Sequence, residues 1–174
     1  MPKGPFNPSQ FTATQWSTVE EKAQFGNTLL HFIDNECKET LFTKKFYNRL
    51  MNTFGHIAHY NREGFYAEWF TNNADRLHFI DHLLRWPCHG DATFTFCDVE
   101  RAIQGEVRSR NYLAKYRVIV AEETRAHEIA VLTRLEAKYR TASSPEPAAD
   151  LTPPLDPMPS QAMASQAPIQ GTLF

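Results

Sequence analysis

Apolar side chains from about residue 17 to residue 140 recur every three to four positions, which is the spacing of one face of an α-helix. A first helix is predicted to begin after Ser17 or Thr18, because a hydroxyl followed by the acidic pair Glu20–Glu21 is typical of a helix N-terminus. The same spacing predicts further helices at about residues 40–54, 62–70, 73–86 and 98–140, the last broken near residues 109–111. The pattern therefore predicts an all-α fold, a compact helical bundle.

Residues 88–97 depart from this spacing, and the alternation Thr93-Phe94-Thr95-Phe96 predicts a loop or one short strand. Asp98, directly after it, is a candidate cap for the helix that follows. The aromatic run 65–70 is expected to lie in the core.

The two ends of the chain differ from its middle. Residues 1–16 combine three prolines with three aromatics and predict an irregular N-terminal arm whose rings pack onto the helical domain of residues 17–140. Residues 141–174, the C-terminal tail, hold seven of the 11 prolines, no basic residue and few bulky apolar ones. A segment this poor in apolar bulk cannot offset its ordering entropy, so the tail is predicted to be disordered.

Composition and charge narrow the function classes. The net charge is −2, and residues 1–140 carry 18 basic and 17 acidic side chains, which excludes a generally basic, histone-like binder. No run approaches the roughly 18 apolar residues of a membrane span, and the N-terminus lacks the apolar stretch of a secretory signal. Three cysteines are expected to be reduced thiols, so the sequence predicts a cytoplasmic protein without a membrane contact.

The last five residues, Gln170-Gly171-Thr172-Leu173-Phe174, carry the strongest functional signal. They resemble the pentapeptide with which bacterial proteins bind the DNA polymerase sliding clamp, which reads Gln, two variable positions, Leu, Phe. The resemblance covers these five residues and implies clamp binding through Gln170, Leu173 and Phe174. Gly171 stands where Leu is often found, which implies weaker binding.

The chemistry of the peptide suits that role. Leu173 and Phe174 are the only adjacent pair of large apolar residues in the tail, and each gains about 1.5–3 kcal/mol when it is buried in a pocket. Gln170 carries a donor and an acceptor that can fix the register. The expected affinity is roughly micromolar or weaker once ordering costs are subtracted. Accident, or another peptide receptor, is the alternative explanation.

Six of the seven histidines fall between residues 31 and 89. Four of them have ligand-like spacing and could hold zinc or a di-metal site with nearby carboxylates, namely His56, His59, His78 and His82, with Asp75, Asp81 or Glu68. This arrangement would make the chain a metal-dependent hydrolase or nuclease. The alternative is that these are hydrogen-bonded histidines at the edge of the core. No zinc signature is present, so we expect no bound metal and no cofactor.

The most basic local segment runs from Arg108 to Arg117. Its cations and interleaved rings could meet phosphates and stack on exposed bases, which makes the following residues candidates for weak nucleic-acid contact: Arg108, Arg110, Tyr112, Lys115 and Arg117. The alternative is a solvated helix face whose tyrosines pack inward.

Two hypotheses follow. The first is an interaction protein that docks on the sliding clamp and acts in, or interferes with, DNA replication or repair, of bacterial, phage or plasmid origin. The second is the metal-dependent enzyme. The sequence lacks a Gly-rich phosphate loop, a nucleophile elbow and a paired-carboxylate motif, which argues against an enzyme.

Overall fold

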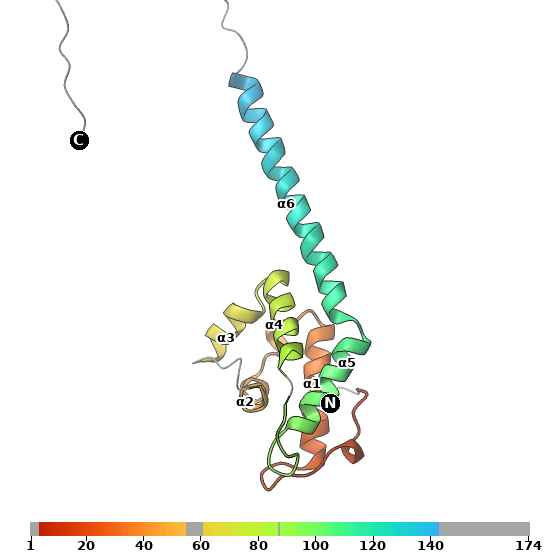
Figure 1. Ribbon diagram of the computed structural model, residues 1–174. Coiled ribbons are helices and arrows are strands. Elements are labelled where there is room, and N and C mark those ends of the chain that lie inside the picture. Colours follow the sequence, from red (N-terminus) through yellow and green to blue (C-terminus); the bar gives the residue numbers. More distant parts are fainter. Residues whose placement is uncertain (1–3, 55–60, 87, 143–174) are drawn as a thin grey trace, which may run out of the picture. The chain divides into compact units, whose positions relative to one another are not determined.

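The computed structural model describes residues 4–54, 61–86 and 88–142, with side chains given up to residue 140. Its described residues form six α-helices (Figure 1): α1 (Val19–Asp34), α2 (Lys44–Thr53), α3 (Arg62–Trp69), α4 (Asn73–Arg85), α5 (Cys97–Ser109) and α6 (Tyr112–Ala142). Two short 3₁₀ turns, Pro8–Gln10 and Glu39–Leu41, complete the regular structure of these residues. The predicted all-α class is confirmed for this part of the chain.

The chain divides into two compact units, residues 1–134 and residues 135–174. The first unit contains α1 to α5 and most of α6. The described part of the second unit is the end of α6. No helix among the described residues combines the length and the apolar character that crossing a membrane requires.

Helix α1 begins as predicted. The Thr18 hydroxyl accepts a hydrogen bond from the Glu21 backbone N–H at 3.3 Å, and the Glu21 carboxylate accepts one from the Thr18 N–H at 3.1 Å. This reciprocal capping box satisfies two N–H groups that the helix itself leaves unpaired. Glu20 lies beside it in the first turn, where a negative charge is favourable.

Two predicted boundaries were wrong. The second helix begins at Lys44 rather than near residue 40, because Thr43 caps it and the preceding residues form the 3₁₀ turn Glu39–Leu41. Asp98 does not cap the fifth helix, which begins at Cys97, so that Asp98 already lies in its first turn. Residues 91–96 form turns rather than a strand, in agreement with the loop alternative.

Helix α1 supplies the centre of the core. Its buried face packs against α5, and Phe32 meets the rings of Phe42, Phe46 and Phe70 at centroid distances of 4.9–5.6 Å. Phe70 also contacts Phe79 of α4 at 4.7 Å. Three of these four ring pairs pack edge to face, which adds to the stabilisation that burial gives. The run 65–70 contributes three buried side chains, as expected: Phe65, Trp69 and Phe70.

The N-terminal arm packs onto α1. Phe6 and Phe11 are buried, and the Asn27 side chain accepts from the Phe6 N–H and donates to the Phe6 carbonyl. Gly26 leaves the space that the Phe6 ring needs, since a Cβ there would lie 2.6 Å from the ring. Trp16, the third aromatic of the arm, remains exposed.

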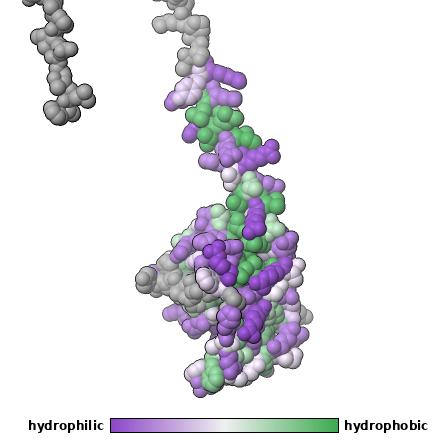
Figure 2. All heavy atoms as spheres, viewed as in Figure 1, coloured by the Kyte–Doolittle hydropathy of each residue, from purple (hydrophilic) through white to green (hydrophobic). Residues whose placement is uncertain are grey.

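The break between α5 and α6 falls where the sequence predicts it. Asn111 adopts a φ of 55°, a left-handed conformation that asparagine tolerates better than most residues. Beyond this corner, α6 runs without interruption from Tyr112 to Ala142. Most of its side chains after Tyr116 are exposed, and Figure 2 shows apolar residues alternating with polar ones along it.

A buried lysine joins the start of α1 to the start of α5. The Lys22 ammonium is fully buried and lies 3.0 and 3.1 Å from the two carboxylate oxygens of Asp98. It also donates to the carbonyls of Ala92 and Thr95. Its charge is therefore both neutralised and hydrogen-bonded, the condition under which a buried ammonium is tolerated.

Candidate functional site

The basic segment Arg108–Arg117 forms the corner between α5 and α6. Arg110 is held there by two acids, with nitrogen–oxygen distances of 3.0 Å to Asp34 of α1 and 3.0 Å to Glu106 of α5. Its guanidinium also donates to the Tyr112 hydroxyl. Arg110 thus ties the end of α1 to the corner and offers little charge to a phosphate.

The two tyrosines of the segment face inward. Tyr112 and Tyr116 are only 5% and 6% exposed, and both belong to the hydrophobic core. The Tyr112 hydroxyl donates a hydrogen bond to Asp34, and the Lys115 ammonium lies 5.4 Å from the centre of the Tyr112 ring. This arrangement matches the alternative interpretation, in which the rings pack inward and do not stack on bases.

Burial and the hydrogen bond to Asp34 raise the pKa of Tyr112 from about 10 to about 12. A raised pKa means that the folded state favours the neutral phenol. The contribution to the free energy of unfolding is therefore complete below pH 10 and is lost as the pH rises through about 12. Urea unfolding between about pH 9 and pH 12 should show a steeper loss of stability for the parent chain than for Tyr112→Phe. Equal slopes would contradict this assignment. Tyr116 and Cys37 also have raised pKa values, but both residues are present in both proteins, so their contributions cancel in the comparison.

Three cations of the segment have exposed side chains. They are Arg108, Lys115 and Arg117. Arg108 makes a 3.3 Å hydrogen bond to the Leu84 carbonyl, and Arg117 lies beside His78 and Asp81 at a shallow opening between α4 and α6. If this segment contacts phosphate, these three side chains would make the contact.

The histidines do not assemble into a metal centre among the described residues. His78 and His82 pack against the Trp69 ring at centroid distances of 4.9 and 5.4 Å. In residues 4–54, 61–86 and 88–142, no group of three His, Cys, Asp or Glu side chains could hold a metal ion. His56 and His59 lie outside the described residues.

The carboxylates nearest these histidines in sequence have other contacts. Asp75 accepts hydrogen bonds from Thr71 and from the side chain of Asn72. Asp81 forms an ion pair with Arg85 one turn along α4. Asp75 therefore bonds to the residues just before α4, and Asp81 bonds within α4.

A second kind of candidate site is a cleft that the sequence does not reveal. It measures about 480 Å³ and brings together the exposed rings of Trp16 and Phe94 with Arg49, Cys88 and Glu100. Burial raises the pKa of the Glu100 carboxyl, and it raises that of the Cys88 thiol. These residues come from the arm, α2, the 88–96 loop and α5, so no local pattern links them.

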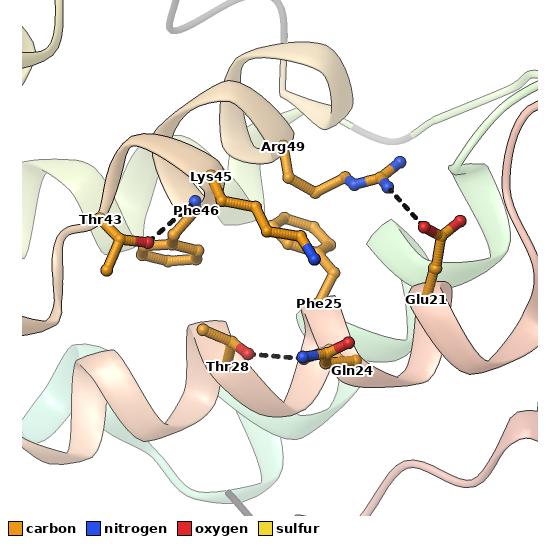
Figure 3. A pocket seen from close by; sticks show the side chains of 8 residues that line it. All are labelled: Glu21, Gln24, Phe25, Thr28, Thr43, Lys45, Phe46 and Arg49. Carbon is orange, nitrogen blue, oxygen red and sulfur yellow. Dashed lines mark hydrogen bonds and ion pairs between the residues drawn. The ribbon is translucent and has the colours of Figure 1, made fainter. Parts of the chain in front are cut away.

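A smaller pocket of about 140 Å³ lies between α1 and α2, and Figure 3 shows side chains of the two helices facing each other across it. Arg49 is fixed at its rim, with nitrogen atoms 2.9 Å from the Ser17 hydroxyl and 3.8 Å from the Glu21 carboxylate. Ligand sites usually exceed about 300 Å³. The pocket is too small for a typical substrate, and its one acid is already paired with a cation.

The clamp-motif residues Gln170, Leu173 and Phe174 lie outside the described residues, as does the rest of the tail from residue 143. Comparison of the chain with protein families, with curated proteins and with solved structures found no match.

Proposed function

We propose that the protein binds a bacterial DNA polymerase sliding clamp through Gln170, Leu173 and Phe174, and that it acts in, or interferes with, DNA replication or repair. The observation that carries the proposal is the sequence Gln-Gly-Thr-Leu-Phe at residues 170–174. The Gln170 side chain supplies the hydrogen bonds that fix the register of the motif. Leu173 and Phe174 supply its apolar anchor, the pair of side chains that is buried in the pocket.

The energetics support a short anchor of this kind. Burial of two large apolar side chains gives about 3–6 kcal/mol before ordering costs. A micromolar dissociation constant corresponds to about 8 kcal/mol, so Gln170 and backbone contacts must supply the remainder. The helical domain is not required for this binding, because the motif is complete within five residues.

A capture experiment tests the proposal. Immobilised clamp should retain the full chain and should not retain a chain that lacks residues 170–174. The truncated chain keeps the whole helical domain, so its far-ultraviolet circular dichroism spectrum should stay that of the parent. Equal retention of the two proteins would refute the proposal.

The exposed cations of the α5–α6 corner give the proposal a second, weaker element, a sequence-independent contact with DNA. A surface with only a few cations binds DNA weakly. The logarithm of the binding constant falls with the logarithm of the salt concentration, with a slope of about −0.9 per phosphate neutralised. At low salt, Arg108→Ala/Lys115→Ala should bind duplex DNA less tightly than the parent in an anisotropy titration. The matched control is Arg62→Ala/Arg85→Ala, which removes two exposed cations from α3 and α4. An equal loss in both variants would show that the effect is one of net charge only.

A further inference from the structure

The outer part of α6 carries large apolar side chains that are exposed among the described residues. Val118, Ile129 and Leu132 are 54–58% exposed, and Leu135 and Tyr139 are also exposed. A helix in water usually owes its stability to the packing of such a face rather than to intrinsic propensity. A face of this kind on a helix of 31 residues is therefore expected to have a partner.

Apart from Ile129, which lies next to them on the helix, the residues of this face have the spacing of a coiled-coil seam. Residues 118, 125, 132 and 139 are spaced seven positions apart. Residues 121, 128 and 135 lie three positions after residues 118, 125 and 132, respectively. Five of these seven seam positions are apolar: Val118, Ala121, Leu132, Leu135 and Tyr139. The two others carry opposite charges, Arg125 and Glu128.

The charges in the seam decide which partner fits. In a parallel pair of identical helices each seam residue faces its own copy, so Arg125 would face Arg125 and Glu128 would face Glu128. In an antiparallel pair centred between residues 126 and 127, Arg125 of each copy faces Glu128 of the other. The same register places Val118 opposite Leu135 and Ala121 opposite Leu132. Apolar positions then meet apolar ones, and the two opposite charges neutralise each other across the seam.

We propose that α6 is a self-association surface, on which a second copy of this chain docks its own α6 in antiparallel orientation. The contact is isologous, because the same face serves both copies. It is also selective against other apolar helices, since a partner must bring an acid opposite Arg125 and a cation opposite Glu128.

Sedimentation equilibrium of the full chain over a range of concentrations tests the surface. The parent is expected to form dimers and Leu132→Glu to remain monomeric. The matched control is His127→Glu, which adds the same charge on the opposite, exposed side of α6 and should leave the dimer intact. Because both side chains are exposed, both variants should keep the circular dichroism spectrum of the folded parent. A monomeric parent at all concentrations, or an unchanged dimer in Leu132→Glu, would overturn the proposal.

Charge reversal tests the orientation. Arg125→Glu places like charges opposite each other in the antiparallel pair and should weaken dimerisation, whereas Arg125→Glu/Glu128→Arg should restore it. In a parallel pair, Arg125→Glu would change an Arg–Arg contact into a Glu–Glu contact. The double variant would have one Glu–Glu and one Arg–Arg contact, as the parent does. The number of like-charge contacts would therefore be the same in all three proteins. An Arg125→Glu variant that dimerises as well as the parent, or a double variant that stays monomeric, would contradict the antiparallel seam.

Discussion

The Asp98→Ala variant is expected to lose about 3–5 kcal/mol of its free energy of unfolding, because the substitution leaves a fully buried ammonium without its counter-charge. Lys22 would keep two carbonyl acceptors, those of Ala92 and Thr95, but no negative group. Asp98 also accepts hydrogen bonds from the backbone N–H groups of Thr12 and Val99, so the arm and the first turn of α5 would loosen as well. Urea denaturation at neutral pH measures the loss.

The matched control is Asp81→Ala, which also removes an aspartate from an ion pair. The Asp81–Arg85 pair is open to solvent, with side chains 34% and 56% exposed, and exposed pairs contribute at most about 1 kcal/mol. Lys22→Met provides a second comparison, because it removes the buried charge while it keeps much of the side-chain volume. It should therefore cost less than Asp98→Ala. If Asp98→Ala were no more destabilising than Asp81→Ala, the buried pair would not have the role assigned to it.

Clamp binding by Leu173→Ala/Phe174→Ala is expected to fall by more than 100-fold, below detection for a micromolar interaction. The two side chains together account for about 3–6 kcal/mol of burial, and each 1.4 kcal/mol is a factor of ten in affinity. Isothermal titration of the clamp with each protein measures the loss.

The matched control changes the two variable positions of the motif, in the double variant Gly171→Ala/Thr172→Ala. It should bind about as well as the parent, because it keeps Gln170, Leu173 and Phe174 and does not introduce the Leu that is often found at position 171. The thermal midpoint should be the same in all three proteins, since the sequence predicts a disordered tail that makes no contact with the helical core. An equal loss of binding in both double variants would show that the pentapeptide does not act through its Leu-Phe anchor.

The helices could be predicted from the sequence wherever capping residues and apolar spacing agree. Thr18 and the acidic pair after it mark the start of α1, and the change of pattern near Asn111 marks the α5–α6 corner. The predicted start of α2 was wrong because Thr40 and Thr43 are both suitable residues for a helix N-terminus. Thr40 lies within a 3₁₀ turn, and the α-helix begins only after Thr43.

Contacts between segments that are far apart in the sequence could not be predicted from local patterns. Lys22 directly follows the acidic pair Glu20–Glu21 in the sequence, and its partner Asp98 is 76 positions away. The local pattern around Asp98 therefore suggested a helix cap instead of an ion pair. The cleft around Trp16 and Glu100 likewise combines four separate segments. For Tyr112 and Tyr116, spacing alone allowed either an inward or an outward face, and the packing of α6 on the core decided it.

The most direct test of clamp binding is a fluorescence anisotropy titration of a labelled peptide of residues 161–174 with a purified bacterial sliding clamp. We predict saturable binding at roughly micromolar strength or weaker, and displacement of the peptide by the unlabelled full-length chain at a similar concentration. Absence of saturable binding by the peptide, or failure of the full-length chain to displace it, would contradict the proposal that the chain docks through Gln170, Leu173 and Phe174.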